Sequence, residues 1–600
     1  MKNFLKYYQD ELLFLRKKGG IFAKNHPEIA DKLDVKEGAS TDPHTERIIE
    51  SVAFMSAKLS QKIDDNAQNI AFHLLSALYP NLINTFPPCS VVRFRNNNNV
   101  SILHKLEIKR GTNLYVKSKA GTECQFRTLY PVTLYPIELC QINLLKVAKK
   151  LGGDDGWCLE LKIKTNSVPI EQMQMDDLLF HINSEIVENS LMIYESIFSD
   201  PNRNVFIKIQ DKYIQLESKD IVPCGFSASE AVCPITPFST NCFQLFQEML
   251  HFKRKFMFFR ILNIGKLIDA NGIKNIDELS IIIDIKISDE YLLQIVKNDS
   301  IILNTTPIVN LFPVTSDPFR FDGTQSKYLL LADQARDEAL EIHSVSELHI
   351  INNETKEDEI IQPYFSLKID ADTNIAHNLY WLHSKESSEL RHLSGFDTYI
   401  SLVDTKMDPY KIYADVVYAK TLCTNRYATR DIPVFSKLYI DDVETAGYHA
   451  ILLHKTTEPV SFLEGTTALW NLISQLSATH LSIAKSENLL SSIRKLCDIF
   501  SAGNGLKVDE LFNEVKNIKI CDAVQRFGQD AWRGFVKGKE VTMEVAEENT
   551  FFSYLLGTIV NQYLSDIVSL NSFVKLQIKS ATTSKLLASW TPTSGRKDVV

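Results

Sequence analysis

The spacing of apolar residues changes at Pro87-Pro88, and this change constrains the fold more than any other feature of the sequence. Before it, apolar residues recur every three or four positions, as on one face of an α-helix. After it, from Cys89 to about Thr456, short runs rich in Val, Ile, Phe and Tyr are broken by Gly, Asn, Asp and Pro, which is typical of strands. We therefore expect an α+β, multi-domain protein in which an N-terminal helical region precedes strand-rich domains with late helices.

The N-terminal region contains two amphipathic patterns that predict helices. The first pattern is predicted to stop at Gly19-Gly20, and it places these residues on one face: Leu5, Tyr8, Leu12 and Leu15. The second begins at Asp42-Pro43, where Asp42 can cap the free amides and Glu46 faces the positive end of the helix dipole. Its apolar stripe consists of Ile48, Val52, Met55, Leu59 and Ile63. A further helix is predicted to end near Leu78-Tyr79-Pro80, since proline cannot continue it.

The middle region is predicted to be mainly strand, and helical spacing returns only near the end of the chain. The clearest strand patterns are 90–94, 113–117, 132–139, 159–165, 280–287 and 398–404. Polar or turn-forming clusters lie at 96–99, 199–202 and 315–318. The late helical stripes are Leu469, Leu472, Leu476, His480 and Ile483, and then Phe552, Leu556, Ile559, Tyr563 and Ile567.

A chain of 600 residues is several times longer than one hydrophobic core usually grows. We therefore predict four parts: a helical region at 1–88, a strand-rich domain at 89–240, a central strand-rich domain at 241–410 and an α+β domain at 411–600. Hydrophobic residues make up 44% and charged residues 23%, which is ordinary for a folded protein.

Charge and targeting patterns exclude several classes of protein. Acidic residues outnumber basic ones by 74 to 65 and no basic block is present, so nucleic acid is not expected as a partner. The N-terminus has charges scattered through its apolar positions, unlike a signal peptide. The longest apolar segment, Phe551 to Val560, is too short to span a membrane. Ten scattered cysteines without a CxxC pair indicate reduced, mostly buried thiols in a cytoplasm.

Motifs that would indicate chemistry are weak. Gly534 to Glu540 is one residue short of a phosphate loop and lacks its Ser or Thr, so a basic turn or strand edge is the preferred interpretation. The HFKRKFMFFRI segment from His251 to Ile261 interleaves basic and aromatic residues, as single-stranded nucleic-acid sites do, but a buried strand with a charged lead-in fits better. The adjacent acids Asp64-Asp65, Asp154-Asp155 and Asp441-Asp442 are interpreted as solvated turns.

Histidines and cysteines do not form a recognisable site either. His26, His44, His73, His181 and His480 lack a second histidine at metal-binding spacing, and His343 and His349 are six residues apart. His480 is interpreted as a hydrogen-bonded core histidine. A Cys–His pair formed by folding stays open, since distant residues can meet. We predict no catalytic, cofactor-binding or metal-binding residue, and therefore no enzyme.

The segments without chemical motifs resemble a known family, the TssF (ImpG/VasA) baseplate subunits of type VI secretion systems. The resemblance runs in order through nearly the whole chain. Its stretches include YYQDELLFLRKKGGIFAKNHPEIADKL (7–33), DPHTERIIESVAFMSAKLSQKIDD (42–65), LLSALYPNL (74–82), GTECQFRTLYPVTLYPIEL (121–139), FQLFQEMLHFKRKFMFF (243–259), PIVNLFPVTSDPFRFDG (307–323), ALWNLISQLSATHLSIA (468–484) and AWRGFVKGKEVTMEV (531–545). The chain has Asp530-Ala531-Trp532 where family members often have Asp-Gly-Trp.

The resemblance implies a structural wedge subunit of a contractile injection machine, with no catalytic residues or cofactors. It implies a TssG-like partner, further copies of the chain itself, TssK-like and TssE-like subunits, and spike and sheath components. It also implies a cytoplasmic protein, without direct membrane insertion, in a baseplate docked at the inner membrane through partners. A wedge protein of a contractile phage tail or phage-derived particle is the alternative, and an uncharacterised hydrolase is a more distant one.

The segments expected to form subunit interfaces are the amphipathic ones. They are the N-terminal helices and the late helices at 468–484 and 551–567. For each helix, the alternative is that its apolar stripe packs inside its own domain. We hypothesise that the helices before Pro80 join a helical bundle with a partner subunit, because alone they would make only a small core.

Overall fold

The computed structural model divides into two compact units, residues 1–76 with 464–473, and residues 77–463 with 474–600. It describes residues 2–32, 42–96, 105–147, 156–165, 168–173, 175–201, 203–210, 212–235, 241–273, 276–286, 291–351, 358–365, 379–388, 395–404, 415–441, 448–461, 466–482, 486–501, 508, 512, 514–526, 535–546, 551–568 and 572–595.

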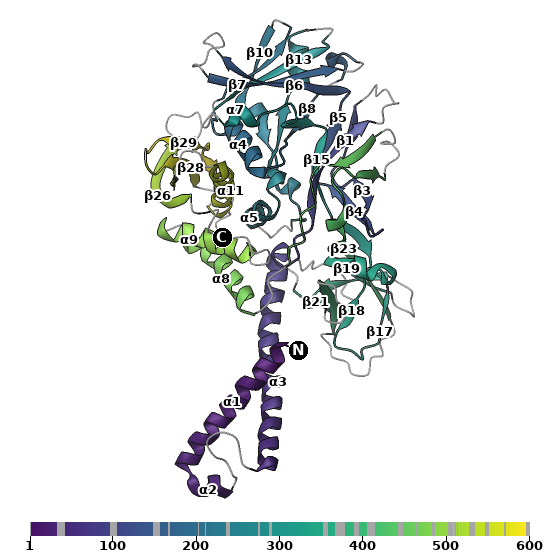
Figure 1. Cartoon of the computed structure of the whole chain (residues 1–600), viewed down its shortest axis with the longest axis vertical. Coiled ribbons are helices and arrows are strands. Elements are labelled where there is room, and N and C mark those ends of the chain that lie inside the picture. The colour runs from purple at the N-terminus through teal and green to yellow at the C-terminus, as the bar shows by residue number, and fades with distance from the viewer. Residues whose placement is uncertain are drawn as a thin grey trace. The chain divides into compact units, whose positions relative to one another are not determined.

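The first unit is helical, and polar side chains join its two long helices. Helices α1 (Lys2–Asn25) and α3 (Pro43–Leu78) run in opposite directions, with α2 (Pro27–Lys32) between them in the chain (Figure 1). The Tyr7 hydroxyl donates to Asp64 at 2.6 Å. The Glu11 carboxylate accepts from the hydroxyls of Ser56 and Ser60 at 2.9 and 3.0 Å. Arg16 forms an ion pair with Glu46, one turn inside α3.

The start of α3 confirms the predicted cap. Asp42 accepts from the backbone amide of His44 at 3.1 Å and from the hydroxyl of Thr45 at 2.9 Å. These hydrogen bonds, that of the His44 amide first, lower the pKa of the Asp42 carboxyl because they favour its charged form. The predicted end at Leu78, before Tyr79-Pro80, is also confirmed.

Two helix predictions in this unit are wrong. Helix α1 continues through Gly19-Gly20 to Asn25, and Gly20 is buried. Glycine inside a helix costs about 1 kcal/mol relative to alanine, which tertiary packing can offset. Helix α3 is one helix of 36 residues rather than two, because no Gly or Pro interrupts it after Pro43. The apolar face proposed for α1 is only half-buried at Tyr8, Leu12 and Leu15, and Leu5 is exposed.

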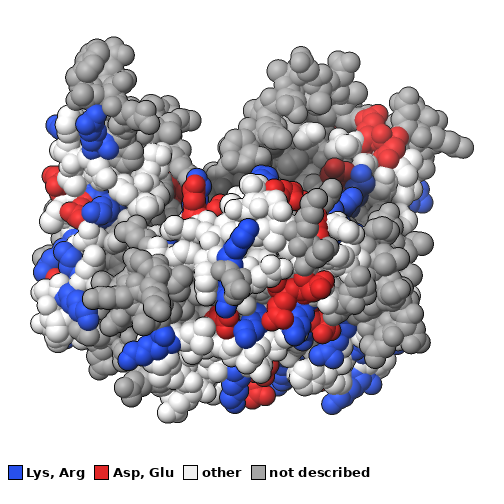
Figure 2. All heavy atoms as spheres, turned by 90° about the horizontal axis from the view of Figure 1, so that it is seen from above, with Lys and Arg blue, Asp and Glu red and all other residues white. Residues whose placement is uncertain are grey.

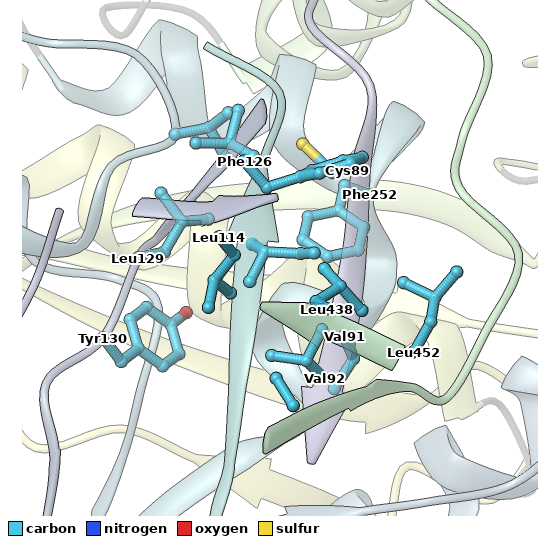
Figure 3. Close-up of a cluster of buried hydrophobic side chains, with 14 of the residues drawn as sticks. Cys89, Val91, Val92, Leu114, Phe126, Leu129, Tyr130, Phe252, Leu438 and Leu452 are labelled. Atoms are coloured by element: carbon cyan, nitrogen blue, oxygen red, sulfur yellow. The ribbon is translucent and has the colours of Figure 1, made fainter. Parts of the chain in front are cut away.

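The second unit contains a closed six-stranded barrel. Around the barrel the strands are β1 (Cys89–Asn96), β15 (Thr305–Val309), β4 (Glu123–Thr128), β3 (Asn113–Lys117), β24 (Lys437–Ile440) and β25 (Tyr448–Leu452), and β25 pairs with β1. Side chains from different strands meet in its core, where Val91, Leu114, Phe126, Leu438 and Leu452 are fully buried (Figure 3). Strand alternation places Arg127 on the outer side of β4, opposite Phe126.

Two sheets and four helices lie between β4 and β15 in the chain. A five-stranded sheet has the order β10 (Lys212–Leu216), β9 (Val205–Ile209), β13 (Glu278–Ile285), β7 (Gly156–Thr165) and β6 (Ile137–Val147). A four-stranded sheet has the order β11 (Ile221–Pro223), β12 (Phe258–Leu262), β8 (Asp177–Ile182) and β14 (Ile301–Leu303). A short ribbon pairs β2 (Leu106–Ile108) with β5 (Val132–Leu134). The helices are α4 (Val187–Phe198), α5 (Asn241–His251), α6 (Ile264–Ala270) and α7 (Leu292–Ile295).

An eight-stranded sheet with its own core lies between β15 and β24 in the chain. Its order is β16 (Phe312–Thr315), β23 (Asp415–Thr424), β19 (Glu341–Ile351), β20 (Asp358–Pro363), β21 (Leu379–Ser387), β22 (Phe396–Asp404) and β18 (Tyr328–Leu330), with β17 (Phe319–Phe321) pairing to β23. Leu348, Ile400, Val417 and Ala419 are fully buried in it.

The C-terminal part joins helices to a mixed sheet. The helices are α8 (Thr466–Ser482), α9 (Ser486–Ser501) and α11 (Phe551–Ile567), and the strands are β26 (Val515–Arg526), β27 (Phe535–Val545), β28 (Phe573–Ser580), β29 (Leu586–Ser589) and β30 (Thr593–Ser594). Strands β27 and β28 are parallel, and α11 connects them. Tyr554 of α11 stacks on Trp590 with ring centroids 5.1 Å apart. A Cβ on Gly557 would lie 2.6 Å from Trp590, so only glycine fits there.

Short 3-10 helices complete the described elements. They are η1 (Pro80–Leu82), η3 (Ile170–Gln172), η4 (Ser218–Asp220), η5 (Ala228–Glu230), η6 (Lys253–Phe256), η7 (Gln334–Ala339) and η8 (Ala428–Asp431).

The predicted fold class is confirmed, because an N-terminal helical region precedes a region in which strands are the prevailing elements. Four of the six quoted strand patterns lie within single strands, 132–139 covers β5 and the start of β6, and 280–285 lies in β13, although helices α4 to α7 of the same region were not predicted. The barrel takes strands from three of the four predicted parts. The division at 88, 240 and 410 stays a prediction.

Phe126 provides a test of the barrel core. Phe126→Ala should lower the free energy of unfolding by about 3–5 kcal/mol, since it removes a fully buried ring and leaves a cavity. The thermal melting of the purified chain measures this loss. Phe435→Ala is the control, because this ring is 71% exposed. Equal shifts in the two variants would contradict the core assignment.

Candidate subunit interface

The surface of the first unit is unusually apolar. Among the described residues, thirty large apolar side chains are exposed, and fifteen of them belong to this unit. They are Leu5, Leu13, Phe14, Ile21, Phe22, Ile29, Ile48, Val52, Phe54, Met55, Leu59, Ile63, Ile70, Leu74 and Trp470. Exposed apolar surface concentrated in so short a part of the chain marks an interaction site.

The α3 stripe, defined as Ile48, Val52, Met55, Leu59 and Ile63, is the most regular part of this surface. Its five members are between 48% and 72% exposed, with Met55 the most exposed. They follow each other by three or four positions, so they form one continuous face of the helix. The sequence predicted this stripe as an apolar face, and the structure places it toward solvent.

The two long helices have their polar groups turned inward. Glu11, Ser56 and Ser60 bond across the contact between α1 and α3, where an ordinary helical hairpin has apolar residues. The five large apolar residues of the α3 stripe are outside, and the apolar residues buried beside Ser56 and Ser60 are the small Ala53 and Ala57. This part of the helix pair therefore buries little apolar surface of its own. Each Leu, Ile or Met that a partner covered fully would add about 1.5–3 kcal/mol.

Sequence reasoning missed the exposed apolar residues of α1. Leu13, Phe14, Ile21 and Phe22 are 40% to 64% exposed. The periodicity argument selected one face and ignored them. The sequence did contain a signal for them, since Leu13 is followed by Phe14 and Ile21 by Phe22. Two adjacent apolar residues of a helix point in different directions, so one buried face does not accommodate both.

The late helix at 551–567 is not an exposed interface in this structure. Phe552, Leu556, Ile559 and Tyr563 of α11 are all buried. The helix packs on β28, α4 and α5 of the same chain, and the Tyr554 hydroxyl donates to the carbonyl of Phe198 at 2.7 Å. The alternative that this stripe serves its own domain is therefore correct. In α8, Leu469, Leu472 and Leu476 are buried as well, whereas Trp470 is 42% exposed.

The candidate histidines remain apart from one another. His181 is fully buried, contacts the carbonyl of Met257 through Nδ1 at 3.1 Å and has a pKa lowered by burial. His349 lies between Glu347 and Asp358, both at 3.1 Å. His26 and His44 are exposed, and His73 is half-buried with a pKa lowered by burial. The side chain of His480 lies outside the described residues. In the described part of the chain, no three His, Cys, Asp or Glu residues are placed to hold a metal ion.

Folding brings one cysteine and one histidine together. The Sγ of Cys233 lies 3.9 Å from Nε2 of His343, and both residues are buried. Burial raises the pKa of the Cys233 thiol and lowers that of His343 to about 3. The thiolate and the imidazolium are both disfavoured, so the pair lacks the charge state of an activated nucleophile. Eight of the ten cysteines are buried, and Cys140 and Cys521 are exposed.

The acidic and phosphate-loop motifs take ordinary positions where they are described. Asp64 lies within helix α3 and bonds to Tyr7, so the predicted turn is wrong there. Asp441 lies in a loop after β24. The motif from Phe535 to Glu540 belongs to strand β27, so a turn does not describe it. Its first half, Phe535 to Lys537, pairs with β26 alone, as a strand edge does, and from Gly538 on the strand also pairs with β28. Asp154-Asp155, Asp442, Gly534 and Asp530-Ala531-Trp532 lie outside the described residues.

The basic and aromatic segment at 251–261 is buried, as the preferred interpretation predicted. Phe256, Phe258 and Phe259 are fully buried, and Lys255 forms a buried ion pair with Glu248 of α5. Glu248 also accepts from the amide of Val232 at 2.7 Å. These rings cannot stack on bases. The face shown in Figure 2 has basic and acidic residues interspersed, without a field of one sign.

Comparison with known proteins identifies the family. The family model described as type VI secretion system, TssF, matches residues 1–597. The chain belongs to the TssF family. A curated relative, the type VI secretion system component TssF1 of Pseudomonas aeruginosa PAO1, is 24% identical over 96% of each chain.

Chains from two solved type VI secretion assemblies have the same fold. A chain from the type VI secretion TssK-TssF-TssG baseplate subcomplex matches with a TM-score of 0.73 at 19% identity, over 92% of this chain and 99% of that one. A chain of a type VI secretion baseplate complex matches with a TM-score of 0.57, also at 19% identity, over 99% and 100%. No described helix of this family member combines the length and apolar character needed to cross a bilayer.

The buried pair of Lys255 and Glu248 provides a stability test. Lys255→Met should destabilise the chain by about 3–5 kcal/mol, since it leaves the Glu248 carboxylate buried without its partner. The double variant with Glu248→Leu should recover much of this loss, and thermal melting compares the two. Lys327→Met is the control, because its ion pair with Glu386 is exposed. A double variant as unstable as the single one would contradict this account.

Glu195 on α4 provides a pH test. Burial raises the pKa of this carboxyl from 4.5 to about 8. The charge of Lys286 opposes this increase, and the charge of Glu514 adds to it. One oxygen of the carboxyl has no hydrogen-bond partner among the described residues. The folded state therefore binds the proton more tightly than the unfolded chain, and stability falls as the pH rises from about 4.5 through 8. Each tenfold change in proton affinity corresponds to about 1.4 kcal/mol.

Glu195→Gln should remove the loss of stability that occurs as the pH rises from about 4.5 through 8. The melting temperature of the variant should exceed that of the unmodified chain more at pH 8.5 than at pH 5. Glu188→Gln is the matched control, on the exposed side of the same helix. A difference between variant and parent that did not depend on pH would refute the assignment.

Proposed function

We propose that this chain is a structural subunit of a type VI secretion baseplate, which binds its neighbours through the exposed apolar surface of the first unit. The observation that carries the proposal is the α3 stripe, five apolar residues that face solvent along one helix while polar groups occupy the contact with α1. Membership of the TssF family supports the type VI assembly over the phage-tail alternative.

The partners follow from the family. A TssF chain of the same fold occurs in a complex with TssK and TssG. We propose a TssG-like subunit as the partner that covers the α3 stripe, as part of a shared helical bundle, with a TssK-like subunit in the same complex. Further copies of the chain, a TssE-like subunit and spike and sheath components complete the proposed wedge, which would seat the tail tube and sheath.

The proposed role is not enzymatic, and it needs no cofactor or metal. The buried Cys233–His343 pair, with both groups neutral, supports this, as does the incorporation of the phosphate-loop-like motif into strand β27. The interspersed surface charges support a protein partner rather than nucleic acid. We propose a cytoplasmic location, with docking at the inner membrane through partners and without direct insertion.

The α3 stripe can be tested by charge substitution. Met55→Glu with Leu59→Glu should abolish copurification of the TssG-like partner, because burying two unpaired carboxylates costs several kcal/mol. The chain alone should keep its thermal transition, since both side chains are more than 60% exposed. Affinity purification of the tagged chain, coexpressed with the TssG-like and TssK-like subunits, measures the change.

Lys58→Glu is the matched control, because Lys58 is exposed on the same turns of α3 but lies outside the stripe. Deletion of residues 1–88 should have the same effect as the double substitution. Undiminished binding of the TssG-like partner by both altered chains would refute the role of this surface.

A further inference from the structure

A pocket on the outer side of the barrel contains an arginine that lacks a counter-charge. The pocket has a volume of about 760 Å³, and β4, the turn before β3, η5 and the chain that follows η5 line it. Arg127 extends into it from β4, and Arg110 lies at its rim. No acidic side chain is among the residues that line it.

Arg127 is half-buried on the outer side of the barrel. Strand alternation turns its side chain away from that of Phe126, which lies in the hydrophobic core (Figure 3). The Nε atom is buried and has no hydrogen-bond partner in the described part of the chain. Burial first, and then the charge of Arg110, lower the pKa of Arg127. A half-buried guanidinium beside a second one is electrostatically unfavourable until an anion joins it.

The groups around the two arginines are arranged to receive such an anion. Arg110 is fixed by a hydrogen bond from Nη2 to the carbonyl of Ala231 at 2.8 Å, which leaves other donors of its guanidinium for a ligand. Cys233, the one group of opposite ionised charge that acts on Arg127 among the described residues, has a pKa raised by burial, so it remains an uncharged thiol. His343 behind it has a pKa of about 3 and is neutral. The anion must therefore come from outside the described residues.

We infer that Arg127 and Arg110 form a binding site for a carboxylate of an acidic side chain in a neighbouring baseplate subunit. Arginine pairs bind carboxylates through two parallel hydrogen bonds, which adds orientation to charge. The rim favours a polypeptide over a free ion, because Ala228, Pro234 and Ile235 provide apolar surface beside the arginines. This inference rests on the proposed baseplate function, and it adds a second contact that is separate from the α3 stripe.

Cross-linking tests the partner directly. Arg127→Lys retains the charge and introduces an amine, which a carbodiimide joins to a carboxylate only when the two are in direct contact. The variant is coexpressed with the TssG-like and TssK-like subunits, purified as a complex, treated with carbodiimide and analysed by mass spectrometry. The expected result is a cross-link from position 127 to an Asp or Glu of another subunit.

Arg93→Lys is the matched control. Arg93 is also half-buried on a barrel strand and its pKa is also lowered by burial, but it does not line the pocket. It should give no such cross-link. An intact complex without a cross-link at position 127 would overturn the inference and leave the proposed function standing. Failure of the unmodified chain to form the complex would refute the proposed function instead.

A second measurement does not depend on the complex. Sodium phosphate, compared with sodium chloride at equal ionic strength, should raise the melting temperature of the purified chain by on the order of 2 °C. The increase should disappear in Arg127→Met and persist in Arg93→Met. An equal response of both variants would show that the pocket has no anion site. A phosphate response specific to Arg127 without the cross-link would mean that the site takes free anions, which also overturns the partner assignment.

Discussion

Closure of the barrel by β1 is the constraint on which the rest of the second unit depends. The strand pairs with β15 through Cys89 to Arg93 and with β25 through Val92 to Asn96. It therefore holds together residues more than 350 positions apart in the sequence. The chain leaves the barrel after β4 to form the five-stranded and four-stranded sheets, and again after β15 to form the eight-stranded sheet. Both excursions return to the barrel, so its closure fixes where each one starts and ends.

Buried asparagines reinforce the junction between the barrel and the eight-stranded sheet. Asn310 donates to the carbonyl of Gln125 and to the side chain of Asn425, both at 2.7 Å, and accepts from the amide of Asn425 at 2.7 Å. Asn425 in turn accepts from the amide of Gln125 at 3.0 Å. Because these hydrogen bonds join the barrel to the segments at either end of the eight-stranded sheet, sliding of one sheet on the other would leave several buried polar groups unpaired. The junction is therefore specified by geometry as well as by apolar burial.

The sequence predicted what depends on local patterns and missed what depends on distant ones. Asp42 as a cap, the end of α3 at Leu78 and the strand at 113–117 follow from neighbouring residues, and the structure confirms them. The continuation of α1 past Gly19-Gly20 depends on tertiary packing, which local propensity does not contain. Helix α5, NCFQLFQEMLH, was missed because the whole region from Cys89 to about Thr456 was predicted to be mainly strand. The α3 stripe was found by its period, but period alone could not tell that it faces solvent.

The two units distribute stability and exposed surface differently. In the second unit even charged groups are enclosed. Glu341 is buried beside Lys385 and Arg426, and burial lowers the pKa of Lys385 to about 8, while Glu341 and then Cys423 limit this lowering. The Lys385 ammonium donates to Asn84 at 2.8 Å and to the carbonyl of His343 at 2.7 Å. Such networks specify one arrangement of their sheets. In the first unit, hydroxyl and carboxylate groups bond across the contact between α1 and α3, the small Ala53 and Ala57 are buried, and the α3 stripe faces solvent. An exposed apolar surface of this kind suits a subunit whose neighbours cover it in a larger assembly.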